Sequence, residues 1–120
     1  MVASQANYRK LDHPGYYKQL LKETKKYPPF FFSCIDKDIP RTLVDGHPFQ
    51  SALRNILYCY AIRNPSLLYC QGMNYIVAFL LINGFSEEEG FWFMIQIIED
   101  IVMTDYFKDL STISVTVQIF

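Results

Sequence analysis

The longest uncharged stretch of the chain runs from Asn64 to Ser86, over 23 positions. A membrane-spanning helix needs about 20 consecutive residues that are mostly apolar. Glycine, proline and amide residues interrupt this stretch, and its unbroken apolar run extends only from Tyr75 to Ile82. That length is typical of a helix buried in a protein core. We therefore predict a core helix here and no transmembrane segment.

The composition indicates a folded protein with more apolar side chains than a chain of this length usually buries. Hydrophobic residues make up 51% of the 120 residues and aromatic residues make up 17%. Charged residues make up 19%, below the roughly 25% of ordinary soluble chains, which excludes intrinsic disorder. Small domains leave a large share of their surface exposed. We therefore expect the chain to be part of a larger domain.

Charge and cysteine content exclude several classes of function. The net charge is −1, and no stretch is basic enough to bind nucleic acid. Cys34, Cys59 and Cys70 form no CxxC pair, and no residues have the spacing of a metal site. His13 and His47 each precede a proline, and neither is near a nucleophile in the sequence. We predict a protein of a reducing compartment with no metal, no nucleic-acid partner and no self-sufficient active site.

Helical periodicity dominates the chain, so the predicted fold class is all-α. Four apolar faces with helical spacing predict four helices. The faces comprise Tyr17, Leu20, Leu21 and Thr24; Phe49, Leu53, Ile56, Leu57 and Tyr60; Met73, Ile76, Val77, Leu80 and Leu81; and Phe91, Met94, Ile95, Ile98, Ile101 and Val102.

Proline and capping residues predict where these helices begin and end. The first helix follows Pro14, because proline suits an early helical position. The second ends near Arg63 or Asn64, because the residue before a proline resists the α conformation. Asn83-Gly84 predicts a C-terminal cap for the third helix. The run from Ser86 to Glu89 predicts a capping box for the fourth.

The third helix, over 71–82, is apolar on almost every side, and such a helix is normally buried on every side. The chain offers too few elements to surround it. We expect Phe91, Met94, Ile98 and the segment Ile113–Phe120 to face parts of a domain that this chain lacks. The tail from Thr112 to Phe120 alternates loosely, as a strand does, but we interpret it as the start of a further helix.

Two short segments are more polar than a helical core explains, Ile35–Thr42 and Tyr69–Asn74. Spacing alone allows a structural role for the main polar residue of each segment. Arg41 could pair with Asp38 on the same helix face, and Gln71 could cap a helix. Arg41 and Gln71 lie 30 positions apart, each beside a predicted helix start. They therefore form a testable pair.

In these two segments the sequence resembles the TBC-domain family, the GTPase-activating proteins of Rab GTPases. Ile35-x-x-Asp38-x-x-Arg41 is similar to the family's IxxDxxR motif, and Tyr69-x-Gln71-Gly72 is similar to its YxQ motif. The resemblance covers roughly Tyr16 to Tyr106. It implies a flexible segment at 1–13 and, at 14–120, a truncated multi-helix TBC-type domain. The family's opening segment and C-terminal half would be absent.

The resemblance also implies how the protein would act. It would not be an enzyme itself but would activate a Rab-type small GTPase in its GTP form. Arg41 would be an arginine finger, Gln71 would position the attacking water, Asp38 would orient Arg41, and Tyr69 would hold the Gln71 backbone; Ile35 and Gly72 complete the motifs. GTP and Mg²⁺ would belong to the partner GTPase, so no cofactor of its own is implied.

The resemblance further implies a cytoplasmic regulator of vesicle trafficking, peripheral at endomembranes, that contacts membranes only through the GTPase. One alternative is a non-catalytic helical scaffold or adaptor that binds small GTPases or trafficking partners. Another interpretation assigns the aromatic surplus to an apolar ligand pocket, although helix-spaced aromatic residues are more often core. Docking alone requires neither Arg41 nor Gln71, so the presence of both favours activation.

Overall fold

The computed structural model describes residues 13–65, 69 and 71–99 of the chain. Its helices are α2 (Tyr16–Thr24), the 3₁₀ helix η1 (Pro29–Phe32), α3 (Ser33–Thr42), α4 (Gln50–Arg63), α5 (Met73–Ile82) and α6 (Glu87–Ile95). This part of the chain contains no strand, and the all-α prediction is confirmed. The predicted flexible segment 1–13 lies outside the described residues except for His13.

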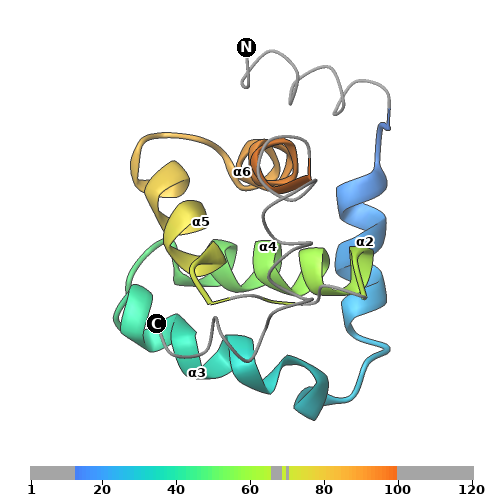
Figure 1. Ribbon diagram of the computed structural model, residues 1–120, viewed down its shortest axis with the longest axis horizontal. Helices are drawn as coiled ribbons and strands as arrows, with labels where there is room; N and C mark the ends of the chain where they lie inside the picture. The colour runs from blue at the N-terminus through green and yellow to red at the C-terminus, as the bar shows by residue number, and fades with distance from the viewer. Residues whose placement is uncertain (1–12, 66–68, 70, 100–120) are drawn as a thin grey trace, which may run out of the picture.

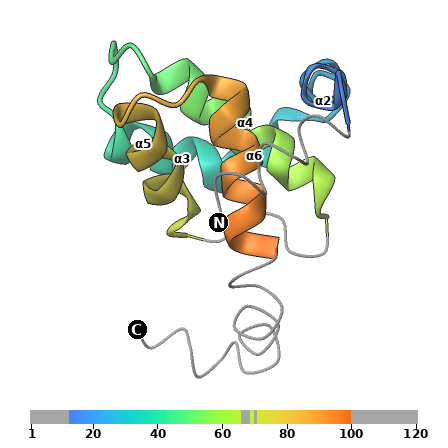
Figure 2. The same ribbon diagram turned by 90° about the horizontal axis from the view of Figure 1, so that it is seen from above.

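Helix α4 is the centre of the fold, and it contacts α2, α3, α5 and α6 (Figure 1). Figure 2 shows α2 on one side of the molecule, α3 and α5 on the other, and α6 crossing between them. Leu53, Ile56, Leu57 and Tyr60 are buried, as their spacing predicts. Cys59 and Ala61 are buried as well. Because neighbours surround α4, it needs apolar residues on more than one face.

The corner between α5 and α6 follows the predicted capping chemistry. Gly84 has a φ of 100°, a left-handed conformation that favours glycine. Its N–H donates to the Leu81 carbonyl, and the Phe85 N–H donates to the Leu80 carbonyl, both at 3.2 Å. These two bonds form a Schellman motif. The side chains and backbone N–H groups of Ser86 and Glu89 then bond reciprocally in a capping box that starts α6.

Helix α4 ends at Arg63, directly before Asn64 and Pro65, as predicted. Within the described part of the chain, no helix has the length and apolar character needed to cross a bilayer. The uncharged stretch instead contains α5, whose residues Met73, Val77 and Leu81 are buried. The prediction of a core helix at this position is therefore confirmed for one face of α5.

Within the described structure, helix α5 has neighbours on one side only, as expected from the shortage of elements to surround it, whereas the prediction for residues in and just after α6 is wrong. Tyr75 is 59% exposed, Phe79 66% and Ile82 59%. Phe91, Met94 and Ile98, which we expected to face missing parts of the domain, are fully buried. The reason is that α6 packs onto α4 and α2; the ring centroids of Tyr17 and Phe91, for example, lie 4.7 Å apart. The segment 113–120, like Ile101 and Val102, lies outside the described residues.

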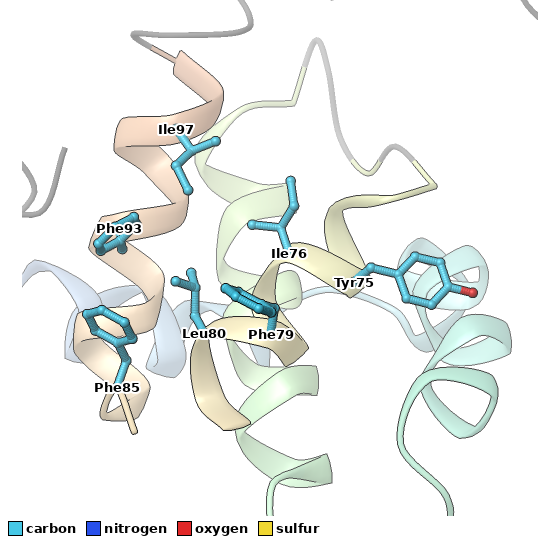
Figure 3. A pocket seen from close by; sticks show the side chains of 7 residues that line it. All are labelled: Tyr75, Ile76, Phe79, Leu80, Phe85, Phe93 and Ile97. Atoms are coloured by element: carbon cyan, nitrogen blue, oxygen red, sulfur yellow. The ribbon is translucent and has the colours of Figure 1, made fainter. Parts of the chain in front are cut away.

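An apolar groove lies between α5 and α6, with a volume of about 470 Å³ (Figure 3). Tyr75, Ile76, Phe79, Leu80, Phe85, Phe93 and Ile97 line it. Figure 3 shows the Tyr75 hydroxyl pointing away from the groove. Small-molecule sites usually combine apolar walls with a few convergent polar groups. The side chains lining this groove offer no such groups, so its chemistry suits another apolar surface better than a ligand.

Candidate functional site

Helix α3 carries Ile35, Asp38 and Arg41 at three-residue intervals, and this spacing sets their exposure. A step of three residues turns the side chain about 60° around the helix axis. Ile35 faces the core and is buried, Asp38 lies at the edge of the core, and Arg41 points to solvent with 74% of its side chain exposed. The IxxDxxR spacing thus places a buried apolar side chain, a largely buried carboxylate and an exposed guanidinium on one helix.

Asp38 and Tyr69 join the two motif segments. The Tyr69 hydroxyl donates to Asp38 Oδ2 at 2.7 Å. Burial and this carboxylate raise the pKa of the Tyr69 hydroxyl well above its usual value, so it remains protonated and keeps donating. The other oxygen, Asp38 Oδ1, lies 3.9 Å from a guanidinium nitrogen of Arg41. One carboxylate therefore contacts both segments.

The backbone conformation of Gly72 shapes the turn that carries Gln71. Gly72 has a φ of 114°, in the left-handed range that side chains rarely allow, and it directly precedes α5. Its N–H donates to Asn74 Oδ1 at 3.0 Å. Its carbonyl accepts from the N–H of Tyr75 at 3.2 Å. Gln71 is left exposed at the tip of the turn, so the local bonds of this turn do not require its side chain as a helix cap.

Sequence reasoning gave no role to Asn74 and Thr42, which also connect the two segments. Asn74 Nδ2 donates to Thr42 Oγ1 at 2.6 Å, and Thr42 Oγ1 donates to the Asp38 carbonyl at 2.7 Å. Asn74 is only 2% exposed. An amide within the most apolar helix of the chain was the signal that could have identified it, because buried amides need hydrogen-bond partners.

Arg41 and Gln71 line the same pocket although they lie 30 positions apart in the sequence. The pocket has a volume of about 320 Å³, and its other lining residues are Cys34, Lys37, Asp38 and Tyr69. Two cationic side chains and an amide at one opening suit an anionic partner. Among the described residues, no cluster of His, Cys, Asp or Glu has the arrangement of a metal site.

Comparisons with known proteins agree on one family. The protein-family model for the Rab-GTPase-TBC domain matches residues 2–120 of the sequence. A TBC domain-containing protein of Schizosaccharomyces pombe is 41% identical over 109 residues, covering 85% of this chain and 14% of that protein. Human growth hormone-regulated TBC protein 1 is 35% identical over 116 residues, covering 90% of this chain and 34% of that protein.

A solved structure has the same fold. The crystal structure of the Chlamydomonas flagellar RabGAP TBC domain matches with a TM-score of 0.63 and 28% identity. The match covers 83% of this chain and 36% of that one. The chain thus spans about a third or less of each of these relatives. The family match over nearly the whole sequence, together with the shared helical fold, shows that the chain belongs to the Rab-GTPase-TBC domain family.

Proposed function

We propose that the protein activates a Rab-type small GTPase in its GTP-bound form by supplying Arg41 and Gln71 to the GTPase active site. The observation that carries this proposal is the pocket that both side chains line. Both are also exposed, so they can extend toward a partner. A scaffold that only binds a GTPase has no need for a guanidinium and an amide at one opening.

The chemistry of phosphoryl transfer suits these two groups. The reaction depends on positioning and on stabilising charge more than on covalent chemistry by the protein. The planar fork of Arg41 would stabilise the charge that develops on the phosphate oxygens. The amide of Gln71 would orient the attacking water. An arginine supplied in trans accelerates other GTPases by about 10³–10⁵.

Asp38 and Tyr69 would hold Arg41 and Gln71 in position. The Asp38 carboxylate would orient the guanidinium, and the bond from Tyr69 would hold the backbone beside Gln71. Ile35 would anchor α3, and Gly72 would provide the backbone turn. The guanine nucleotide and Mg²⁺ would be held by the partner GTPase, so this protein would need no cofactor of its own and would not itself be the enzyme.

The setting of this activity follows from its target. A protein that switches off a Rab would regulate vesicle trafficking from the cytoplasm. It would reach endomembranes peripherally, through the membrane-attached GTPase.

Single-turnover GTP hydrolysis by a panel of Rab proteins tests the proposal. We expect the protein in excess to accelerate hydrolysis by at least one Rab. Arg41→Ala should remove the acceleration, whereas Arg54→Ala should retain it. Arg54 is a matched control because it also lies near an α3 carboxylate, Asp36 at 3.8 Å, but does not line the pocket. Binding of GTP-loaded Rab without faster hydrolysis would identify a scaffold instead and refute the proposal.

A further inference from the structure

We propose that Asn74 is a positioning residue that fixes the Gln71 turn to the end of the helix that carries Arg41. This inference rests on the proposed function, because it concerns how the side chains of Arg41 and Gln71 are held at a fixed distance from each other. It assigns no contact with the GTPase to Asn74 itself, which is 2% exposed.

The evidence is a chain of three hydrogen bonds that crosses from one segment to the other. The Gly72 N–H donates to Asn74 Oδ1 at 3.0 Å, and Asn74 Nδ2 donates to Thr42 Oγ1 at 2.6 Å. The Thr42 hydroxyl then donates to the Asp38 carbonyl at 2.7 Å. The chain begins on the backbone next to Gln71 and ends in the helical turn that contains Arg41.

The donors and acceptors in this chain allow few substitutes. Asn74 must accept with its oxygen and donate with its nitrogen, and a neutral amide does both. The Thr42 hydroxyl has one proton, and it donates this proton in the hydrogen bond to the Asp38 carbonyl. The lone pairs of the hydroxyl oxygen therefore remain available to accept from Asn74. A buried group that loses its partner is not rescued by water, which makes such a chain costly to break.

The last turn of α3 depends on this support because Pro40 lies within the helix. Proline has no backbone N–H, so one intrahelical hydrogen bond is missing just before Arg41. The Thr42 side chain adds a bond to the same turn, and Asn74 fixes the Thr42 side chain from the neighbouring helix.

Each proposed finger thus lies between two connected residues. Arg41 lies between Asp38 and Thr42, which bond to Tyr69 and Asn74 respectively. Gln71 lies between Tyr69 and Gly72, whose N–H bonds to Asn74. The Tyr69–Asp38 bond and the Asn74–Thr42 bond connect the two segments on opposite sides of the proposed fingers, so together they fix the distance between Arg41 and Gln71. The Tyr69–Asp38 bond alone would allow the two segments to rotate about it. A displacement of about 1 Å can cost 10²-fold in rate.

Thr42→Val tests this role, because valine keeps the shape of threonine and removes its hydroxyl. We expect the maximal rate of GTP hydrolysis at saturating protein to fall about 10- to 100-fold. The protein concentration giving half of that rate should change less than about threefold, since the contact surface is retained. Thr42→Ser, which restores the hydroxyl, should recover most of the maximal rate.

Thr24→Val is the matched control. Thr24 Oγ1 also donates to a carbonyl of its own helix, that of Leu21 at 2.6 Å, but it lies in α2 and not at the pocket. Asn74→Ala should reproduce the loss of rate, and Asn55→Ala should not, although Asn55 also donates its amide across helices, to Glu87. Equal maximal rates for Thr42→Val and Thr24→Val would overturn the inference.

Amide hydrogen exchange separates this inference from the proposed function. In the protein alone, Thr42→Val should speed exchange of the Gly72 amide about tenfold, because Asn74 loses the group that orients it. Thr24→Val should leave that amide unchanged. Unchanged exchange at Gly72 in Thr42→Val refutes the inference even if Rab activation is observed. If no Rab is activated, the proposed function fails, and faster Gly72 exchange would still establish the structural connection.

Discussion

The hydroxyl of Tyr69 and the carboxylate of Asp38 are joined by a 2.7 Å hydrogen bond across 31 positions of the sequence. The same carboxylate lies 3.9 Å from Arg41 at its other oxygen. The bond therefore connects the residue two positions before the proposed glutamine finger to the residue that faces the proposed arginine finger. Removal of the Tyr69 hydroxyl should therefore affect activity more than removal of a hydroxyl that makes a comparable hydrogen bond elsewhere on α3.

Tyr69→Phe should lower the free energy of unfolding by about 1 kcal/mol, the usual effect of one hydrogen bond, and should also slow Rab GTP hydrolysis. Tyr58→Phe is the matched control, because Tyr58 likewise donates to an α3 carboxylate, that of Asp36. It does not line the pocket, so its loss should affect stability alone. Urea unfolding and single-turnover hydrolysis measure the two effects. Equal activity of the two variants would contradict the role given to Tyr69.

Arg41→Ala and Arg41→Lys should both abolish activation while leaving the melting temperature unchanged. The stability should persist because the side chain is 74% exposed and its ion pair with Asp38 is as long as 3.9 Å. Lysine keeps the charge but loses the forked geometry, so the two rates should agree within about tenfold. Single-turnover hydrolysis measures both, and a near-normal rate in either variant would rule out an arginine finger at this position.

Gln71→Ala should reduce hydrolysis strongly, because Gln71 would orient the attacking water. A Rab that lacks its own catalytic glutamine should, for the same reason, still be activated by the unmodified protein. Hydrolysis assays with the two Rab forms measure this difference. If activation disappears together with the glutamine of the Rab, the water is oriented by the GTPase and Gln71 has another role.

Helices α2, α4, α5 and α6 could be predicted from the sequence because their signals are local, whereas η1 and α3 were not predicted. The capping box at Ser86, the glycine cap at Gly84 and the helix end before Pro65 depend on residues within one or two turns. The relationship between Tyr69 and Asp38 could not be predicted from spacing, because it depends on how α3 and α5 pack. The resemblance to a family gave Asp38 and Tyr69 separate roles, but neither it nor a local pattern predicted that the two residues bond to each other.

The exposure of individual helix faces was also beyond the sequence. Phe91 and Phe79 have similar hydrophobicity, yet Phe91 is fully buried and Phe79 is 66% exposed. The difference arises from which helices lie beside them, a tertiary property. Asn74 was missed for the same reason: its partner Thr42 lies 32 positions away, and only the fold brings them together.

Cys59 gives a prediction of pH dependence. Burial, and secondarily the charge of Glu87, raise the pKa of its thiol from 9.0 to about 12. The unfolded chain releases this proton above pH 9, whereas the folded chain keeps it until about pH 12. The stability that the buried neutral thiol contributes is therefore fully present below pH 9 and is lost as the pH rises toward 12.

Cys59→Ala should reduce the slope of the free energy of unfolding against pH in this range by up to about 1.4 kcal/mol per pH unit, the value for one proton. Urea unfolding between pH 7 and pH 10.5 measures the slope. Cys34→Ala is the control, because Cys34 is exposed. A slope that is the same in Cys59→Ala and the unmodified protein would show that this thiol ionises equally in both states.

The apolar groove predicts how the 120-residue chain behaves when it is studied alone. We expect it to bind a hydrophobic dye and to associate, because the groove and the exposed face of α5 form one apolar region. Phe79→Ser should reduce both effects. Phe30→Ser should reduce them much less, although Phe30 is 77% exposed, because it does not line the groove. Dye fluorescence and light scattering measure the difference, and equal effects of the two substitutions would refute the prediction.

The corner from Leu80 to Glu89 has a consequence for that groove. Its Schellman motif and capping box adjoin so closely that only Phe85 lies between Gly84, which follows the end of α5, and Ser86, the N-cap of α6. The hydrogen bonds of the corner, together with the packing of both helices on α4, therefore restrict the angle between α5 and α6, and they preorganise the groove. An apolar surface that packs into it meets a fixed shape, so association does not incur the conformational entropy of ordering a hinge.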